Sequence, residues 1–426
     1  MATVSIRARV ASLLALVLAV SAVHAQGAVL VVDYLNGPYL TVEDAIAAAA
    51  DGDTILVHSG AYAAPQIVGR SLTIAAAEGA LVSFSWGEYS TNPNEIRDLA
   101  PDDVVVLRGI SFNDLRLIDN AGLVWLEDCD VVFGAPGLLV ESSDNVVLVR
   151  DTLFGQNGFI DPGAYFSQSS SVGARFTDSR VAMYDCTVLG GNGSSFVLTS
   201  LGPAFPHHGE DAIEVHGGEL RLSGCTATGG SGGKGGSDSL YGCFEGAPGG
   251  HGVQLVDGSP VLVVRDSALA GGPGGPAETS PPPTCSFGSS GPGADGLPVL
   301  VQSGTLTNVD GPARHVQVSG PVSEGEPLHL TAAGAPGDAL LLLVAMQPRL
   351  TLKSADVGAL LVATPQLVVA LGVLGVPAEL DVSATLPELG PGFAGIHVFV
   401  QGAFKPGVGG PVLGSGSVLI ALDSAF

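Results

Sequence analysis

Basic residues are scarce in this chain of 426 residues, which has 16 Lys and Arg against 41 Asp and Glu. The formal net charge is −25 at pH 7, so nucleic acid and anionic membranes would be repelled, and neither is expected as a partner. Charged residues of both signs make up only 13% of the chain, and 46% of it is hydrophobic, which excludes a disordered acidic tail. With 61 Gly, the composition indicates a folded protein rich in turns.

An uninterrupted apolar segment long enough to span a membrane is also missing from the body of the chain. The stretch from Val357 to Val376 carries no charge, but Pro365 and Gln366 lie at its centre and glycines interrupt it. No basic cluster follows it. The pattern therefore predicts two buried strands joined by a turn at Thr364-Pro365, and no membrane span.

The first 25 residues have a different character. Arg7 and Arg9 precede an apolar stretch, and Val23-His24-Ala25 provides an acceptable cleavage site. This order is typical of a secretory signal peptide. We therefore expect residues 1–25 to be removed and the protein to be secreted or held at the cell surface.

A short helix is predicted ahead of a series of strands. Thr41 is a good N-cap, with Asp44 three residues later as a capping-box partner. Four apolar residues then fall on one helical face: Val42, Ala45, Ile46 and Ala49. Such a helix can cover the open end of a stacked coil, which would otherwise expose its core and unpaired backbone.

The strands that follow repeat one pattern of apolar residues, a polar pair and a small residue. The repeated segments are "VVVLRGIS", "LVWLEDCD", "VVLVRDTL", "RVAMYDCT", "ELRLSGCT" and "VLVVRDSA". Their aligned small positions are Ile110, Cys129, Thr152, Cys186, Cys225 and Ser267. A second repeated strand appears as "EDAIEV", "GHGVQL" and "ADGLPVL", and the later repeats are lengthened by Gly-rich insertions. This order predicts a solenoid, in which each unit buries its face against its neighbours.

The predicted helix with "DGDTILVHSGAY" and the rungs after it resemble the right-handed parallel β-helix of the pectin-lyase-like superfamily. The resemblance implies an all-β solenoid over residues 26–311, capped by the helix. It does not imply one activity, because that superfamily contains lyases, hydrolases, esterases, epimerases and non-catalytic surface proteins.

Beyond residue 311 the composition changes. Short strands alternate with turns in "RHVQVSG", "EPLHLTAAG", "ALLLLVAM", "AELDVSATLP", "GIHVFVQGAF" and "SGSVLIAL". We predict a β-sandwich over residues 312–426, which resembles the small C-terminal β-domains of secreted bacterial proteins.

The five cysteines are of two kinds. Cys129, Cys186 and Cys225 occupy the small position of the rungs and are expected to be buried free thiols, although a bridge between Cys186 and Cys225 is possible. Cys243 and Cys285 each lie in a long Gly-rich loop, at a separation that matches the local repeat. We predict a disulfide between them, since flexible loops of a secreted protein gain most from a covalent link.

Aligning the second strands places Asp211, His251 and Asp295 at one rung position. Flanking carboxylates would raise the imidazole pKa, and the column could transfer protons. The same column also fits a polar corner ladder, in which each side chain bonds the backbone of the next turn. We expect His251 to be such a corner residue.

"GEDAIEV" resembles the paired-acid motif of polygalacturonase-like glycoside hydrolases, and "GHGVQL" resembles their histidine motif. The resemblance implies Asp211 as general acid, Glu210 in activation of water and His251 in support. The upstream Asn-x-Asp and downstream Arg-x-Lys motifs of those enzymes have no counterpart, because the neighbouring rungs read "GGNGSSFVL" and "ADGLPVL". An arginine base beside a Ca²⁺-binding acid cluster, as in pectate lyases, is not recognisable either.

Other candidate ligand-binding residues are fewer. Asp295 is one, and the aromatic candidates in loops are Trp86, Tyr89, Tyr165 and above all Tyr241, in a Gly-rich loop. Five metal-ligating types fall within ten residues, namely His207, His208, Glu210, Asp211 and His216, but surface His-His pairs are common, and neither a metal nor a cofactor is expected.

Two hypotheses remain. The first is a non-catalytic secreted or cell-surface scaffold that binds a polysaccharide or another surface component. The second is a polysaccharide-active enzyme, a glycoside hydrolase or lyase, with its site at Glu210, Asp211 and His251. The missing motifs favour the first hypothesis.

Overall fold

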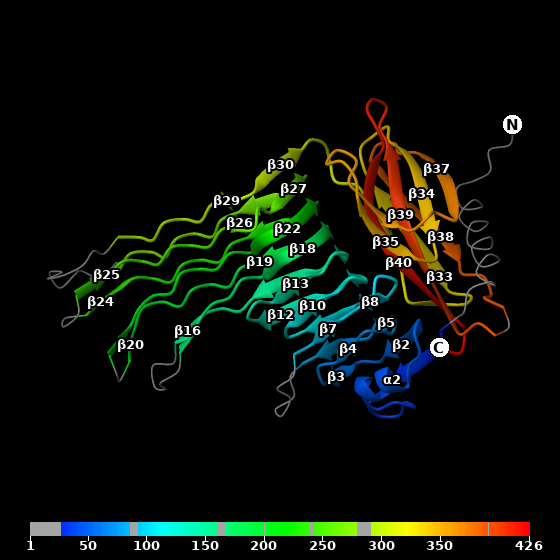
Figure 1. Ribbon diagram of the computed structural model, residues 1–426, viewed down its shortest axis with the longest axis horizontal. Helices are drawn as coiled ribbons and strands as arrows, with labels where there is room; N and C mark the ends of the chain where they lie inside the picture. The colour runs from blue at the N-terminus through cyan, green and yellow to red at the C-terminus, as the bar shows by residue number, and fades with distance from the viewer. Residues whose placement is uncertain are drawn as a thin grey trace.

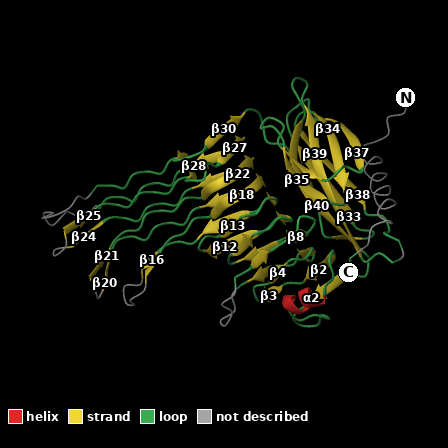
Figure 2. Cartoon of the chain, in the orientation of Figure 1, coloured by secondary structure: helices red, strands yellow, loops and turns green. Residues whose placement is uncertain are grey.

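The computed structural model describes residues 27–85, 93–160, 167–199, 202–238, 242–278, 291–390 and 392–426. The chain forms a parallel β-solenoid followed by a smaller β-sandwich (Figure 1; Figure 2). The fold class expected from the sequence is confirmed. Within the described ranges, the structure contains no helix with the length and apolar character that crossing a membrane requires.

Each turn of the solenoid contributes a strand to each of three faces. The first face contains β1 (Val29–Val32), β2 (Asp53–Val57), β5 (Leu72–Ala76), β8 (Val104–Arg108), β11 (Leu123–Glu127), β14 (Val146–Val149), β27 (Val261–Arg265) and β30 (Thr305–Val309). The second contains β3 (Gly60–Tyr62), β6 (Val82–Phe84), β9 (Ile110–Phe112), β12 (Asp130–Gly134), β15 (Thr152–Gly155), β19 (Thr187–Leu189), β23 (Thr226–Thr228) and β28 (Ala268–Ala270). The third contains β4 (Gln66–Val68), β7 (Glu95–Arg97), β10 (Leu115–Ile118), β13 (Leu138–Glu141), β26 (Val253–Leu255) and β29 (Val299–Val301).

Two long strands, β18 (Ala174–Tyr184) and β22 (Ile213–Ser223), continue around the corner between the third and first faces. They join these faces into a 16-stranded sheet, while the second face is an 8-stranded sheet. The register stacks like residues in the core: Ile55 lies beside Ile74, Ile74 beside Leu107, and Leu107 beside Leu126. Because each turn repeats the last, the apolar interior is one continuous column of side chains.

The predicted column of small residues is present at the corner between the first and second faces, with one correction. The register places Asp151, and not Thr152, between Cys129 and Cys186, since Thr152 pairs with Asp130 and Thr187. Asp151 Oδ1 accepts from the Cys129 backbone N–H at 2.8 Å. A carboxylate therefore occupies a position that the alignment had assigned to a small side chain.

The N-terminal end is closed as predicted. Helix α2 (Val42–Ala48) begins after Thr41, whose Oγ1 accepts from the Asp44 N–H at 3.2 Å. Val42, Ala45 and Ile46 are buried against the first turn of the solenoid. The helix thus covers apolar side chains that have no preceding rung to pack on.

The last solenoid strand ends at Val309, and the sandwich strands begin at His315. One sheet contains β31 (His315–Val318), β33 (Pro327–Ala333) and β38 (Glu379–Thr385). The other contains β32 (Val322–Ser323), β40 (Val412–Leu422), β39 (Gly395–Lys405), β34 (Ala339–Ala345) and β37 (Leu367–Val373). A third, two-stranded sheet pairs β35 (Pro348–Leu352) with β36 (Ala359–Val362). Strands β36 and β37 confirm the predicted break at Thr364-Pro365, but only β36 is buried as predicted, because β37 lies at the edge of its sheet and is largely exposed.

The sandwich packs on the outside of the first solenoid face. Outward side chains there, including Val106, Trp125 and Val147, form an apolar cluster with Phe399 and Ile420 of the sandwich. The Trp125 and Phe399 rings meet edge to face at 5.6 Å. Strands such as "LVWLE" are therefore buried on both faces, which explains their nearly continuous apolar sequence.

Candidate functional site

A long arm projects from the corner between the second and third faces (Figure 1). We define the arm as the described parts of residues 156–173, 190–212, 229–252 and 271–298, the segments that connect β15 to β18, β19 to β22, β23 to β26 and β28 to β29. In each excursion the chain runs outward in an extended path and then returns. Short antiparallel pairs lie far from the solenoid: β16 (Phe159–Ile160) with β17 (Ser167–Gln168), β20 (Val197–Thr199) with β21 (Gly202–Ala204), and β24 (Gly236–Asp238) with β25 (Gly242–Phe244).

Hydrogen bonds in the arm recur at every third residue. Along one outgoing segment, the N–H groups of Gly229, Gly232 and Gly235 donate to the outgoing segment of the next turn at 2.9 to 3.0 Å. The residues one position later, Gly230 and Gly233, donate across to a returning segment at 2.7 and 2.9 Å. A three-residue period with bonds only between segments is the geometry of polyproline II helices. The arm is thus a bundle of such helices in two layers.

Glycine occupies the positions where the segments meet. A Cβ at Gly230 would lie 2.0 Å from the Gly191 carbonyl oxygen, and one at Gly233 would lie 1.9 Å from that of Ser194. These distances leave no room for a side chain, for the same reason that collagen needs Gly at its axis. The sequences "GGSGGKGGS" and "GGPGGP" follow from this: two positions in three are interior and the third faces outward.

The outward position carries side chains that bond the next turn. Asn157 Oδ1 accepts from the Asn192 N–H, and Asn192 Oδ1 accepts from the Ser231 N–H, both at 2.8 Å. The backbone N–H of these outward residues points away from the other segments and finds no carbonyl there. A side chain of the preceding turn accepts its hydrogen bond instead. This ladder runs along the outgoing layer.

The returning layer has the same ladder, and it contains two of the predicted catalytic residues. Asp211 Oδ1 accepts from the His251 N–H, and His251 Nδ1 accepts from the Leu297 N–H at 2.8 Å. The predicted backbone-bonding ladder is therefore present at this corner. Its third member is Leu297, and the predicted assignment of Asp295 to the column is wrong, because the register pairs Val253 with Val299.

Asp295 instead lies at the last turn of the arm. Its Oδ1 accepts from the Gly274 N–H at 2.8 Å. Pro292 and Pro298, each three residues from Asp295, have no N–H to leave unpaired. Together these residues reduce the number of backbone N–H groups left without an acceptor at the edge of the bundle. Natural proteins protect the exposed edge strands of sheets in a similar way.

Glu210 lies next to Asp211 on the returning segment, and its backbone N–H donates to Gly191. Its Oε1 is 3.4 Å from His208 Nδ1 and 3.4 Å from Ser170 Oγ. Burial raises the pKa of Glu210, and the charges of Glu214 and Asp211 raise it further, while His208 opposes them. Burial also raises the pKa of Asp211, against the hydrogen bond from His251. A carboxyl with a raised pKa can hold and donate a proton nearer to neutral pH.

The five possible metal ligands do not converge. His207 Nδ1 lies 3.0 Å from Ser194 Oγ inside the arm, whereas His216 Nδ1 lies 3.0 Å from Asp257 Oδ1 on the third face. Among the residues that the structure describes, no group of three or more His, Cys, Asp or Glu is arranged to hold a metal ion.

Several predicted residues lie outside the described ranges. These are Trp86, Tyr89, Tyr165, Tyr241 and Cys285. Cys243 is buried in β25. Because Cys285 is not described, its disulfide with Cys243 stays a prediction. The three rung cysteines, Cys129, Cys186 and Cys225, are free and buried as expected.

Sequence reasoning missed a cluster of phenylalanines at the far end of the arm. Phe196 and Phe244 stack with ring centroids 5.1 Å apart, and Phe205 meets Phe244 edge to face at 5.1 Å. Phe205 is 57% exposed. The sequence signal was that each of the three phenylalanines stands in one of the Gly-rich insertions, where aromatic residues are few.

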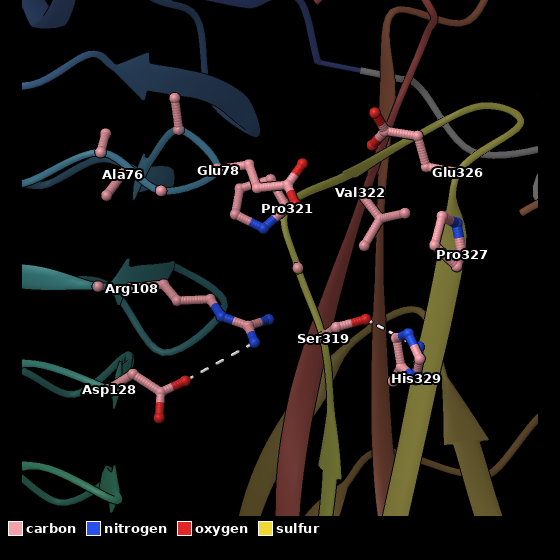
Figure 3. Close-up of a pocket in the computed structure, with 15 residues that line it drawn as sticks. Ala76, Glu78, Arg108, Asp128, Ser319, Pro321, Val322, Glu326, Pro327 and His329 are labelled. Atoms are coloured by element: carbon pink, nitrogen blue, oxygen red, sulfur yellow. Dashed lines mark hydrogen bonds and ion pairs between the residues drawn. The ribbon is translucent and has the colours of Figure 1, made fainter. Parts of the chain in front are cut away.

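Two clefts lie between the solenoid and the sandwich. In the first, of about 450 Å³, Glu78, Arg108 and Asp128 of the solenoid face Ser319 and His329 of the sandwich (Figure 3). The Nη atoms of Arg108 donate to the Val318 and Val418 carbonyl oxygens. Arg108 is thus engaged in holding the sandwich, and this cleft offers no free guanidinium to a ligand.

The second cleft, of about 440 Å³, is lined by Thr54, Thr73 and His397 among others. His397 Nε2 lies 2.8 Å from Thr54 Oγ1, and Nδ1 lies 3.4 Å from Thr73 Oγ1. These bonds again connect the sandwich to the solenoid.

Glu127 connects the same two parts from inside the contact, and sequence reasoning also missed it. Its side chain is fully buried, with Arg150 Nη2 at 2.6 Å and Arg108 Nη2 at 3.5 Å. It accepts from the Trp125 Nε1–H at 3.0 Å and from the Val418 N–H at 2.8 Å. A buried carboxylate between two guanidinium groups fixes the sandwich on this face.

Geometry thus defines a parallel β-solenoid with a C-terminal β-sandwich and a lateral arm of polyproline II helices. Comparison with protein-family models and with curated proteins finds no match to this chain.

Proposed function

We propose that this protein is a non-catalytic scaffold of the pectin-lyase-like type, secreted or held at the cell surface, which binds a glycan or another surface component. The observation that carries the proposal is the arm. Its backbone is hydrogen bonded between segments with a three-residue period, and it ends in exposed aromatic side chains. A rigid extension of this kind presents a binding surface at little entropic cost.

The candidate catalytic side chains support a structural role. Asp211 and His251 both bond the backbone of the next turn, and they do so by the rule that Asn157 and Asn192 follow on the other layer. These bonds stabilise the arm whether or not a substrate is present.

Binding and depolymerisation can be measured together. The full chain is incubated with a panel of neutral and acidic polysaccharides, and both retention on the polysaccharide and new reducing ends are recorded. We expect retention without new reducing ends. Retention of no polysaccharide in the panel would contradict the proposal.

A polysaccharide-active enzyme, a glycoside hydrolase or lyase, is the second candidate. The observation that favours it is the raised pKa of two adjacent carboxyl groups, Glu210 and Asp211. New reducing ends, or unsaturated products for a lyase, that disappear in a folded Asp211→Asn variant would establish this alternative and exclude the scaffold.

A further inference from the structure

We infer that the end of the arm binds a neutral sugar residue, in a pocket formed by the phenylalanine cluster; this inference rests on the proposed function and names its site. The pocket has a volume of about 420 Å³ and is open to solvent. Its lining includes Phe205, Pro206, His208, Phe244, Glu245 and Pro248.

The aromatic side chains provide a fixed apolar surface. Phe244 is held between Phe196, which stacks on it with ring planes 20° apart, and Phe205, which meets it at 81°. Phe205 remains 57% exposed although a large apolar side chain gains free energy from burial. An exposed ring beside a pocket suits the apolar C–H face of a sugar, which can cover it without losing its hydroxyl hydrogen bonds.

The backbone below the rings is also held in place. The Gly209 N–H donates to the Pro248 carbonyl at 2.9 Å, and the Ala247 N–H donates to Gly233 at 2.9 Å. Pro206 and Pro248 add side chains with little rotational freedom. The pocket is therefore largely formed before a ligand arrives, which lowers the entropy cost of binding.

The polar side chains determine the class of ligand. Glu245 and His208 are exposed at the pocket, and its lining contains no Lys or Arg. An anionic sugar would meet the Glu245 carboxylate without a counter-charge. The hydroxyl groups of a neutral sugar can donate hydrogen bonds to the Glu245 carboxylate. They can also donate to, or accept from, the His208 imidazole. We therefore assign the site to neutral glycans and not to polygalacturonate.

Calorimetric titration of the full chain with neutral and acidic oligosaccharides tests the site. The variants are Phe205→Ala and Glu245→Gln, and the matched control is Phe159→Ala, because Phe159 is 55% exposed on the neighbouring β16 but lies outside the pocket. We expect Phe205→Ala to weaken binding of a neutral oligosaccharide about tenfold or more. Glu245→Gln should weaken it several-fold, and Phe159→Ala should leave it unchanged.

The outcomes separate the site from the function. If wild-type protein binds a glycan and Phe205→Ala binds it as well as Phe159→Ala does, the site is wrong while the scaffold function stands. If polygalacturonate binds in preference to every neutral sugar, the ligand class is wrong. If wild type binds no glycan at all, the function fails and the site fails with it. Equal protease resistance of the arm in all variants confirms that each is folded.

Discussion

The carboxylate of Asp211 accepts a hydrogen bond from the backbone N–H of His251, forty residues later in the chain. His251 then accepts from the N–H of Leu297 in the following turn. The N–H groups of Asn192 and Ser231 on the other layer are bonded in the same way, each by a side chain one turn earlier. Two residues with the appearance of a catalytic pair are therefore successive members of a ladder.

The ladder makes a specific prediction for His251. His251→Ala removes the acceptor of the Leu297 N–H and should lower the free energy of unfolding by about 1–2 kcal/mol. His251→Asn should retain most of that stability, because Asn192 Oδ1 performs the same role for Ser231. Denaturant titration of both variants measures the effect. Equal losses in the two would mean that the imidazole contributes by packing instead.

Gly233 should not tolerate a side chain. Its Cβ would lie 1.9 Å from the Ser194 carbonyl oxygen, so Gly233→Ala must push two segments of the arm apart, at a cost of about 1–3 kcal/mol. Gly410→Ala is the control, because nothing lies within 4 Å of a Cβ there. Hydrogen exchange of arm amides should rise in the first variant alone. Unchanged protection in Gly233→Ala would contradict the close packing of these helices.

Glu127 should be essential for holding the sandwich on the solenoid. Glu127→Gln removes the fully buried negative charge beside Arg108 and Arg150 and leaves them only the partly exposed Asp128 as a counter-charge, which should cost about 3 kcal/mol. Asp144→Asn breaks an exposed ion pair with Arg180 and should change stability by less than about 1 kcal/mol. Thermal unfolding of the two variants compares them. Similar melting temperatures would show that Glu127 is dispensable.

His397 should make the contact between solenoid and sandwich sensitive to acid. Burial lowers the pKa of His397 to about 4, whereas an unfolded histidine titrates near 6.5. The unfolded state therefore binds the proton first, so this contribution to stability is complete above pH 6.5 and is lost as the pH falls toward 4. Between pH 7 and pH 4, wild type should lose about 1–3 kcal/mol more than His397→Gln does. Parallel pH profiles of the two proteins would refute this.

The distal cysteines carry the last prediction. We expect intact protein to contain one disulfide, between Cys243 and Cys285, since it would tie two excursions of the arm together. Peptide mapping without reduction should recover the linked peptides, and Cys129, Cys186 and Cys225 should be alkylated only after unfolding, because they are buried. Recovery of Cys243 and Cys285 as two alkylated thiols would disprove the bridge.

Local sequence patterns determined most of the elements. The Thr41 cap, the period of apolar residues after it and the repeated "VVVLR"-type segments are short-range signals, and they predicted the helix and the stacked strands. The sandwich strands were equally visible from alternation between turns. The register was less secure, because Thr152 and Asp151, or Asp295 and Leu297, differ by one or two positions that periodicity alone does not resolve.

The sequence by itself determined that the chain is a solenoid with a β-rich C-terminal part, since repeated apolar strands can bury their faces only by stacking. Only the tertiary structure decided what the Gly-rich insertions do. Their backbone bonds join residues about twenty to forty positions apart, and a bundle of glycine helices has almost no side-chain pattern from which to read those partners. The same holds for Glu127 and Val418, which are 291 residues apart in the chain. They meet because the sandwich covers the outer side of the first solenoid face.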